Sequence, residues 1–374
     1  MVVPADDAVS TLLAALQDVL DGHSAALTPV AADGDPSILA ALRVGEPVDD
    51  DVALVVTTSG TTGAPKGALL TGAALRASAT ATENRLGGPG RWLLALPPHH
   101  IAGIQVVVRS LLAGTTPVQI DVATGFDVEQ LPAAVAELGS GRRYTSLVAT
   151  QLAKALEAPA STAALAELDA VLLGGGPAPQ PILDAAAAAG VRVVRTYGMS
   201  ETAGGCVYDG VPLSGVRVGI GGDGRIALGG PTLARGYRNP VDPDPFAEPG
   251  WFHTNDIGAL DSSGRLSVLG RADDAISTGG LTVLPGPVEA VLSTHPAVAD
   301  CAVFGVPDDR LGQRVVAAVV VAGAEPPTLA ALRAHIAGSL DATAAPRELH
   351  IVAALPRRGI GKLDRKSLVR QFSR

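Results

Sequence analysis

Residues 54–72 have the sequence LVVTTSGTTGAPKGALLTG, in which an apolar run is followed by small polar residues, glycines and one lysine. Gly60, Gly63 and Gly67 can adopt positive φ, so that neighbouring amide N–H groups point into one concavity. Hydroxyl and ammonium donors lie in the same stretch, at Ser59, Thr61, Thr62 and Lys66. Because such donors suit an anion with several oxygens, the stretch predicts a loop that binds a polyphosphate.

Two other interpretations of this stretch explain it less well. The P-loop pattern GxxxxGK[ST] fails because, counted from Gly60, Pro65 stands at the second glycine position and Gly67 follows the lysine. A flexible linker is disfavoured because the stretch lies between the strand-like run VALVV and a helix that is predicted to begin at Thr71. Phosphate binding therefore remains the leading interpretation.

The composition is that of a globular protein with small core side chains. Hydrophobic residues make up 47% of the 374 residues but aromatic residues only 3%, so the cores must be tightly packed from alanine and valine. The length allows two domains, or three. The net charge of −9 argues against broad binding to nucleic acid, whereas Lys66, Arg271 and Lys362 lie in short motifs that allow a local nucleotide site.

Cysteine content and the first residues bear on the cellular compartment. Cys206 and Cys301 cannot build a disulfide framework, and the start MVVPADDAVS lacks the basic and apolar regions of a signal peptide. The longest apolar run, near residues 315–324, is about half of the ~20 residues that a membrane-spanning helix needs. We expect a cytoplasmic protein without membrane insertion. The oligomeric state stays open, with a homodimer among the alternatives.

From Val52 to Tyr197, β-rich runs alternate with alanine- and leucine-rich segments. The predicted strands are VALVV, WLLAL, TPVQI, YTSLVA, DAVLLGG and VRVVRTYG. This alternation predicts a largely parallel sheet covered by helices, whose ligands bind at the carboxyl ends of the strands. Because TSGTTG, PPHH, GGGP and YGMSE each follow a predicted strand, we expect them to converge on one rim.

After Gly210 the pattern changes to short runs broken by glycine, which predict hairpins or a small barrel. Beyond GRADDAISTGG, helices and strands alternate in a pattern that suffices for a compact α+β domain. We place the boundary at Arg271 to Asp274, which divides the chain into residues 1–272 and 273–374. The expected fold class is α/β, with mainly parallel, helix-covered sheets and a small β-barrel-like part in the larger domain.

Several motifs occur in a specific order: TSGTTGAPKG, LPPHHIAG, GGGP, YGMSET, WFHTNDIG, GRADDAISTGG and PRRGIGK. Together they closely resemble the adenylate-forming superfamily of acyl-CoA synthetases, peptide-synthetase adenylation domains and luciferases, from Thr57 to Lys362. The resemblance implies an AMP-forming acid–thiol ligase with a mobile C-terminal lid, which uses ATP, Mg²⁺ and coenzyme A. A carboxylate would displace pyrophosphate from ATP, and a thiol would then take the acyl group from the adenylate.

The resemblance gives roles to individual charged residues. Lys362 matches the catalytic lysine, which bridges the acyl carboxylate and the α-phosphate and offsets negative charge in the transition state. Glu201 matches the Mg²⁺-binding glutamate, and Asp256 matches the aspartate that accepts hydrogen bonds from both ribose hydroxyls. Arg271 would contact ribose or phosphate, or else would only end a hairpin. His100 would close the acyl pocket.

The resemblance also implies which residues bind nucleotide and coenzyme A. Tyr197 would stack on adenine, and the backbone of Gly174–Gly176 would approach the adenine edge, although a turn is an equal alternative there. Asp273 would be the hinge of the lid, or would merely end a hairpin, and Gly280 would let the pantetheine chain pass. The implied set is Thr58, Ser59, Gly60, Thr61, Thr62, Gly63, Lys66, Gly174, Gly175, Gly176, Tyr197, Gly198, Ser200, Asp256, Arg271, Asp273 and Gly280.

Two residues depart from the family pattern. Ser200 stands where threonine is frequent, which keeps the hydroxyl, and Asn255 replaces the usual glycine before Asp256, which concerns the local backbone and not the carboxylate. A metal site at His99 and His100 is disfavoured, because adjacent side chains point in different directions and no cysteine or carboxylate cluster lies nearby in the sequence.

Within the superfamily, the compact form looks most like actinobacterial o-succinylbenzoate–CoA ligases of menaquinone biosynthesis. The phosphate loop begins at residue 58, LPPHHIAG and STGGLTVLP are present, and no carrier-attachment motif follows the last lysine motif. An acid with a second carboxylate would need a polar anchor. The candidates are Ser277, Thr278 and Thr282, or Arg and Ser/Thr side chains beyond His100.

Three rival functions remain open. Another aryl- or fatty-acyl-CoA synthetase shares all the motifs and differs in the shape of its pocket. A stand-alone adenylation enzyme would load a carrier protein instead of coenzyme A. A non-catalytic nucleotide-binding module would be expected to lose Lys362, Glu201 or Asp256, all of which are present.

Overall fold

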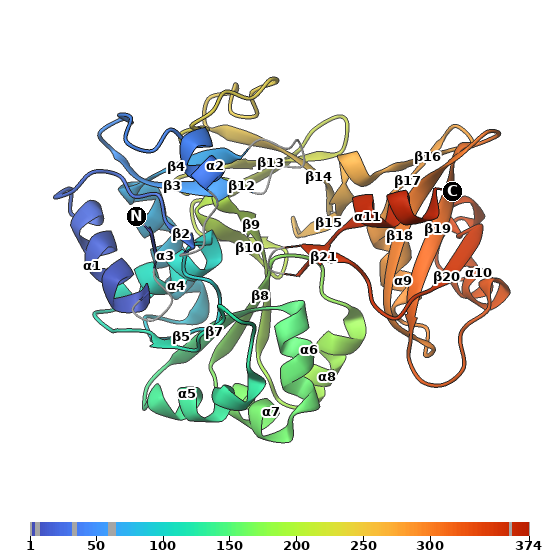
Figure 1. The fold of residues 1–374 in the computed structure, drawn as a ribbon, viewed down its shortest axis with the longest axis horizontal. Coiled ribbons are helices and arrows are strands. Elements are labelled where there is room, and N and C mark those ends of the chain that lie inside the picture. Colours follow the sequence, from blue (N-terminus) through green and yellow to red (C-terminus); the bar gives the residue numbers. More distant parts are fainter. Residues whose placement is uncertain (1, 4–7, 32–35, 59–64, 359–360, 374) are drawn as a thin grey trace.

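The computed structural model describes the chain except for residues 1, 4–7, 32–35, 59–64, 359–360 and 374. Figure 1 shows a larger body that holds the N-terminus and a smaller body that holds the C-terminus. The larger body begins with short elements, of which β1 and β2 pair in parallel. These elements are β1 (Val2–Val3), α1 (Ala8–Leu20), β2 (Val30–Ala31) and α2 (Pro36–Ala41).

The predicted phosphate loop is closed at its base by two antiparallel strands. The elements are β3 (Val52–Thr58), β4 (Lys66–Thr71) and α3 (Gly72–Leu86). Thr58 of β3 pairs with Lys66 of β4, and the Thr71 side chain caps α3, as the sequence predicted. The sequence did not predict β4. It also placed β3 in the parallel sheet, which is wrong, because β3 and β4 form a two-stranded sheet of their own.

The parallel sheet forms the middle of the larger body. Its seven strands follow the order β11-β10-β9-β8-β7-β5-β6. The five strands from β9 to β6 are parallel to one another, whereas β10 runs antiparallel to β9 and β11, so the predicted parallel character is confirmed. The strands are β5 (Arg91–Leu94), β6 (Val118–Gln119), β7 (Arg143–Val148), β8 (Ala170–Gly174), β9 (Val193–Met199), β10 (Gly204–Tyr208) and β11 (Val211–Pro212).

Helices cover both faces of this sheet (Figure 1). Trp92 and Leu94 of β5 pack in one core with α1, α3 and α4, while Leu93 and the following Ala95 pack in a second core with α5 to α8. Alternate side chains thus point to opposite faces, as expected of a strand buried on both sides. The helices are α4 (Ile101–Leu112), η1 (Val128–Gln130), α5 (Leu131–Glu137), α6 (Ala149–Glu157), α7 (Pro159–Ala166) and α8 (Gln180–Ala188).

An antiparallel meander of four strands, in the order β12-β13-β14-β15, completes the larger body. It corresponds to the hairpins that the glycine-broken runs predicted. Ile226 and Leu228 of β13 pack against Cys206 and Val207 of β10, which joins the meander to the parallel sheet. The elements are η2 (Ser200–Thr202), β12 (Arg217–Ile220), β13 (Arg225–Gly229), β14 (Trp251–Leu260), β15 (Leu266–Arg271) and η3 (Ala272–Asp274).

The smaller body has its own core on both faces of a five-stranded sheet. Val303 of β18 packs with α9 and α10, whereas its neighbours Ala302 and Phe304 pack with α11. The elements are β16 (Ile276–Thr278), β17 (Leu281–Val283), α9 (Pro285–Leu292), β18 (Val298–Asp308), β19 (Gly312–Val321), α10 (Leu329–Ala337), η4 (Ala342–Ala344), β20 (Glu348–Ile351), β21 (Arg357–Arg358), β22 (Lys362–Leu363) and α11 (Arg365–Phe372). The hairpin β21–β22 and α11 were not predicted.

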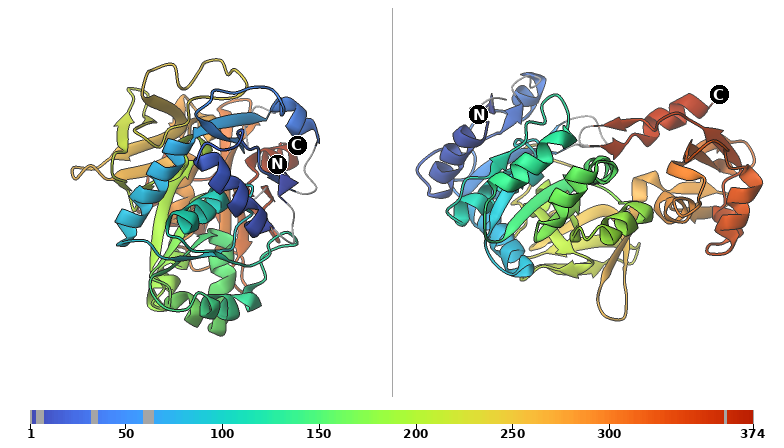
Figure 2. Two further views of the ribbon diagram at one scale, coloured as in Figure 1. Left: turned by 90° about the vertical axis from the view of Figure 1, so that its left-hand side faces the viewer. Right: turned by 90° about the horizontal axis from the view of Figure 1, so that it is seen from below.

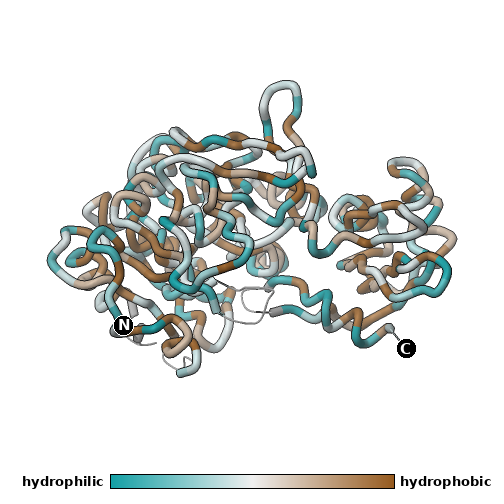
Figure 3. The backbone as a smooth tube through the Cα atoms, turned by 90° about the horizontal axis from the view of Figure 1, so that it is seen from above, coloured by the Kyte–Doolittle hydropathy of each residue, from teal (hydrophilic) through white to brown (hydrophobic). Residues whose placement is uncertain are grey.

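The hairpin β21–β22 extends from the smaller body back toward the larger one (Figures 1 and 2). Figure 3 shows hydrophobic residues gathered inside each body, while this returning segment is mostly hydrophilic. Among the described residues, no helix has the length and apolar character that a bilayer crossing requires.

Candidate active site

Three of the predicted motifs share one edge of the parallel sheet. PPHH follows β5, GGGP follows β8 and YGMSE ends β9, and these strands run in the same direction. Their carboxyl ends therefore meet at one rim, where ligands of such sheets bind. Of the fourth motif, TSGTTG, only Thr58 is described. Ser59, Gly60, Thr61, Thr62 and Gly63 lie outside the described residues.

Two residues implied in nucleotide binding are in direct contact. Tyr197, in β9, donates a 2.7 Å hydrogen bond from its phenol to Oδ2 of Asp256 in β14. Burial, and next the charge of Asp256, raise the pKa of Tyr197 above its ordinary value, so the phenol keeps its proton and remains a donor. The hydrogen bond from Tyr197 thereby holds the Asp256 carboxylate at the rim.

Asp256 also starts a chain of ion pairs that leads to the predicted hinge. Arg271 lies opposite Asp256 in the β14–β15 ladder and donates to its Oδ1 at 3.4 Å. The same guanidinium donates to both oxygens of Asp273, at 2.8 and 3.1 Å. Asn255, the departure before the aspartate, is exposed and accepts a 2.6 Å hydrogen bond from Arg225, so its side chain lies on the solvent side.

The implied metal ligand is held by a tyrosine that the sequence analysis did not single out. Glu201 in η2 is only 8% exposed, and its Oε1 accepts a 2.6 Å hydrogen bond from the phenol of Tyr237. Lys66 Nζ lies 5.4 Å from the centroid of the same ring, within cation–π range. Burial, and next Glu201, raise the pKa of Tyr237, which keeps it a donor. Tyr237 therefore joins the implied magnesium ligand to the implied phosphate lysine.

Glu201 suits a magnesium ion by the chemistry of its donor. Mg²⁺ prefers carboxylate oxygen and is commonly held by one or two protein carboxylates, with phosphate oxygens and water completing its shell. Among the described residues, no group of three or more His, Cys, Asp or Glu side chains could hold a metal without such help. The carboxylate of Glu201 therefore fits a metal that would share its ligands with a polyphosphate.

His100 of the larger body and Lys362 of the smaller body are near enough for the lysine charge to act on the imidazole. His100 is the N-cap residue of α4, and Lys362 begins β22. The pKa of His100 is lowered to about 4, first by burial and then by the positive charges of His99 and Lys362. The imidazole is therefore neutral near pH 7. Next to the lysine, a side chain at Gly361 would place its Cβ 3.2 Å from Oγ1 of Thr150, so the hairpin contacts the start of α6.

At most of the glycines of the rim, the structure explains why no side chain is present. A Cβ at Gly174 would lie 2.7 Å from Thr196 Oγ1, and a Cβ at Gly198 would lie 2.1 Å from the Gly204 carbonyl oxygen. Gly175 has φ of 85°, which favours glycine. Gly176 differs, since no atom lies within 4 Å of its Cβ position. Of the GGG motif, it is thus the position that faces open space.

The residues proposed for coenzyme A and for a second carboxylate lie in the smaller body. Gly280, with φ of 80°, is in the turn between β16 and β17. Ser277 and Thr282 pair across this hairpin and are exposed, whereas Thr278 is buried. Strand β16 of this hairpin pairs with β19, and Figure 1 shows both strands in the smaller body, apart from α4 of the larger body. Ser200 remains at the rim, where η2 begins.

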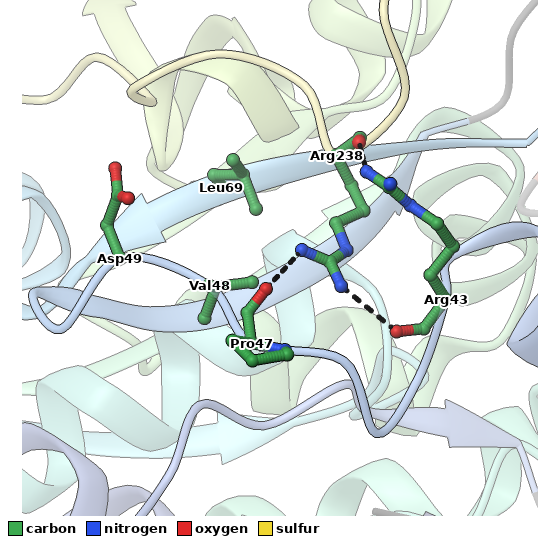
Figure 4. A pocket seen from close by; sticks show the side chains of 6 residues that line it. All are labelled: Arg43, Pro47, Val48, Asp49, Leu69 and Arg238. Atoms are coloured by element: carbon green, nitrogen blue, oxygen red, sulfur yellow. Dashed lines mark hydrogen bonds between the residues drawn. The ribbon is translucent and has the colours of Figure 1, made fainter.

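A surface cavity of about 350 Å³ is lined by other residues than these (Figure 4). The side chain of Arg238 crosses it and donates to the carbonyl oxygens of Pro47, at 2.7 Å, and of Arg43, at 3.1 Å. Arg43 in turn donates to the carbonyl oxygen of Arg238 at 2.6 Å. These bonds tie the segment before β3 to the segment after the meander's first hairpin, so the cavity has a structural explanation.

Comparisons with known proteins agree with this geometry. The model of the family described as AMP-binding enzyme matches residues 5–238, and that of the AMP-binding enzyme C-terminal domain matches residues 287–362. A probable 2-succinylbenzoate–CoA ligase of Mycobacterium tuberculosis is 72% identical over 374 residues, covering 99% of this chain and 97% of that protein. A 2-succinylbenzoate–CoA ligase of Geobacillus kaustophilus is 34% identical over 94% of this chain and 75% of its own length.

Solved structures give the same picture. The o-succinylbenzoate CoA synthetase of Bacillus subtilis, in complex with an acyl-adenylate intermediate, superposes with a TM-score of 0.73 at 32% identity, covering 85% of this chain and 69% of that one. An amide bond synthetase from Marinactinospora thermotolerans gives a TM-score of 0.79 at 28% identity, covering 88% of this chain and 71% of that one.

Proposed function

Because the chain belongs to the AMP-binding enzyme family, we propose that it is an o-succinylbenzoate–CoA ligase, which activates the acid with ATP and passes the acyl group to coenzyme A. The structural observation that carries the proposal is the close approach of Gly361 to Thr150, which brings the neighbouring Lys362 to the rim that also holds Tyr197 and Asp256. The choice of acid is supported by the 72% identity over nearly the whole chain to a probable 2-succinylbenzoate–CoA ligase.

The first half-reaction forms a bond between a carboxylate oxygen and the α-phosphorus and breaks the bond to pyrophosphate. Lys362 supplies positive charge to the oxygens that gain negative charge in this step. His100, neutral near pH 7, closes the acyl side of the site without adding charge. Asp256, held by Tyr197, accepts hydrogen bonds from the ribose hydroxyls.

Glu201 would hold Mg²⁺, which when bound neutralises charge on the phosphate oxygens. Tyr237 fixes the orientation of the Glu201 carboxylate and places its ring beside Lys66. One side chain therefore contacts both the metal ligand and the phosphate lysine. In the second half-reaction the thiol sulfur bonds to the acyl carbon, AMP leaves and the thiol loses its proton.

We also propose that residues 1–272 and 273–374 are the domains that move relative to each other, with Asp273 as the hinge and Gly280 beside the pantetheine path. Two observations support this division. The cores of the smaller body draw only on residues after Asp274, and a cavity of about 360 Å³ adjoins the hinge, lined by Ala272, Ala275 and Leu284 among others. We further propose a cytoplasmic location, which the use of ATP and coenzyme A would support, and a homodimer.

A comparison of acids tests the proposed function. The kcat/KM for coenzyme A thioester formation is measured with o-succinylbenzoate, benzoate, coumarate and octanoate. We expect o-succinylbenzoate to exceed the monocarboxylates by at least tenfold. Equal or better turnover of a monocarboxylate would assign the chain to another acyl-CoA synthetase, and pyrophosphate release without thioester would favour an enzyme that loads a carrier protein.

A further inference from the structure

Arg365, the first residue of α11, is the centre of a partly buried network in the smaller body. Its Nη2 lies 2.6 Å from both carboxylate oxygens of Glu289 in α9, and its Nε donates to the Val303 carbonyl oxygen at 3.2 Å. The Val303 N–H donates in turn to Glu289 Oε1 at 2.8 Å. The guanidinium is therefore fixed by a strand and a helix at once, with Nη2 shared between the two carboxylate oxygens and Nε on the strand.

The same guanidinium reaches the hinge segment. Nη1 of Arg365 donates to Oδ2 of Asp274 at 3.3 Å. The preceding residue, Asp273, is bonded to Arg271 of the larger body instead. The two consecutive aspartates of η3 are thus held by different arginines, one on each side of the proposed domain boundary.

Lys362 is only three residues before Arg365 in the sequence. Three residues span at most about 11 Å even when fully extended, so the position of Arg365 limits where the lysine can lie. Between them, Asp364 caps α11 through Ser367, and its N–H donates to the Pro356 carbonyl oxygen at 2.8 Å. The connection from the lysine to the arginine is therefore short, and hydrogen bonds of Asp364 hold it in place.

We infer that Arg365 is a positioning residue for Lys362, because it ties the start of α11 to the hinge through Asp274 and to α9 through Glu289. The lysine and the hinge then move as one body. This inference rests on the proposed function, since it assigns Arg365 to the half-reaction in which Lys362 acts. The side chain of Arg365 is engaged with Val303, Asp274 and Glu289, so its effect on the reaction would pass through Lys362.

Replacing Arg365 alone leaves Glu289 buried without its partner. Burial already raises the pKa of Glu289 in spite of Arg365, so the single variant is expected to lose stability. We therefore choose two variants that leave no buried charge without its partner. Asp274→Asn removes only the negative charge of the link to the hinge, and Arg365→Met with Glu289→Met replaces the buried pair by apolar side chains of similar size. Arg370→Met is the matched control, because Arg370 lies on the same helix and donates to Ser367 Oγ at 2.9 Å.

The experiment measures both half-reactions in single turnover, with the acid that the wild type adenylates best, beside a thermal melt. For the folded Arg365→Met, Glu289→Met variant we expect adenylate formation to slow at least tenfold with an unchanged KM for ATP, and transfer from pre-made acyl-adenylate to change less than threefold. Asp274→Asn should act in the same direction, and Arg370→Met should match the wild type.

A double-mutant cycle with Lys362→Ala completes the test. If Arg365 acts through Lys362, the added Arg365→Met and Glu289→Met changes should slow adenylation less than twofold in the Lys362→Ala background. The same slowing in both backgrounds, or wild-type adenylation by the folded variant, would overturn the inference. A wild type that adenylates another acid better than o-succinylbenzoate would contradict the proposed function alone.

Discussion

The phenol of Tyr197 and the carboxylate of Asp256 form a 2.7 Å hydrogen bond that links the parallel sheet to the meander. The sequence implied separate roles for these residues, with one on adenine and the other on ribose. The structure joins them, since the carboxylate that would accept the ribose hydroxyls is oriented by the ring that would stack on the base. The adenosine portion of ATP would therefore meet one preorganised unit.

The first prediction concerns this bond. Tyr197→Phe removes the donor but keeps the ring, so Asp256 loses a charge-assisted hydrogen bond worth about 1.5–3 kcal/mol. We expect the KM for ATP to rise about tenfold, with kcat changed less than threefold. Steady-state kinetics at saturating acid and coenzyme A measure both constants, and an unchanged KM for ATP would show that the bond does not orient Asp256.

The second prediction concerns the tyrosine that holds Glu201. Tyr237→Phe keeps the ring beside Lys66 but frees the carboxylate, so a higher Mg²⁺ concentration should be needed for half-maximal adenylation, by about three- to tenfold. Tyr144→Phe is a suitable control, because it removes a phenol that donates to Leu86 and Gly88 carbonyl oxygens away from the rim. That control should lower the melting temperature and leave the Mg²⁺ dependence unchanged. Equal Mg²⁺ curves for both variants would refute the assignment of Tyr237.

The third prediction is a pH dependence of stability. His100 has a pKa of about 4 in the folded protein against 6.5 for an ordinary histidine, so the unfolded state binds the proton first as the pH falls. Stability is full above pH 6.5 and is lost as the pH falls toward 4, by on the order of 3 kcal/mol from this group. Urea unfolding of the wild type and of His100→Gln at pH 7 and 4.5 tests this. If the free energy of unfolding fell by the same amount between these pH values in both proteins, the prediction would be contradicted.

The pKa of His100 also depends on the charge of Lys362. In Lys362→Ala the pKa of His100 should rise, because one of the positive charges that lower it is removed while its burial stays. Titration of the His100 ring by NMR measures the change. A pKa that stays the same would mean that the hairpin does not approach the rim in solution.

The fourth prediction concerns the hinge. Asp273→Pro fixes φ near −65° and should hinder rotation of the smaller body, so thioester formation should suffer more than adenylation. Gly280→Leu should act in the same direction by filling the pantetheine path without touching ATP. Rapid-quench measurement of each half-reaction, with a thermal melt, separates this from a loss of stability, which would slow both steps together. A folded Asp273→Pro variant with wild-type acyl transfer would end the hinge proposal.

Much of the larger body could be predicted because its strands are continuous apolar runs between helical segments. β4 escaped prediction because KGALLT is short and directly precedes a capped helix, which left its pairing with β3 invisible to periodicity. Tyr237 and Arg365 escaped because their partners, Glu201 and Glu289, lie far away in the sequence. Local patterns carry no signal for such pairs.

Local patterns likewise predicted the position of some site residues and not of others. Residues in motifs that follow strands, such as His100 and Tyr197, lie on one rim because parallel strands end together. Lys362 reaches that rim only because a hairpin of the smaller body extends across, which no local pattern could indicate. Ser277 and Thr282, chosen for their polarity near the domain boundary, pair in the β16–β17 hairpin of the smaller body, so they do not explain how a second carboxylate would be anchored at the rim.

The most direct test of the account is the rate of acyl-adenylate formation from o-succinylbenzoate and ATP in Lys362→Ala, followed by rapid quench beside transfer of pre-made adenylate to coenzyme A. Because the lysine charge is needed where pyrophosphate leaves, we predict a loss on the order of 10²–10³ in the first step and an almost unchanged second step. Equal losses in both steps, or wild-type adenylation without the lysine, would contradict the role given to Lys362 at this rim.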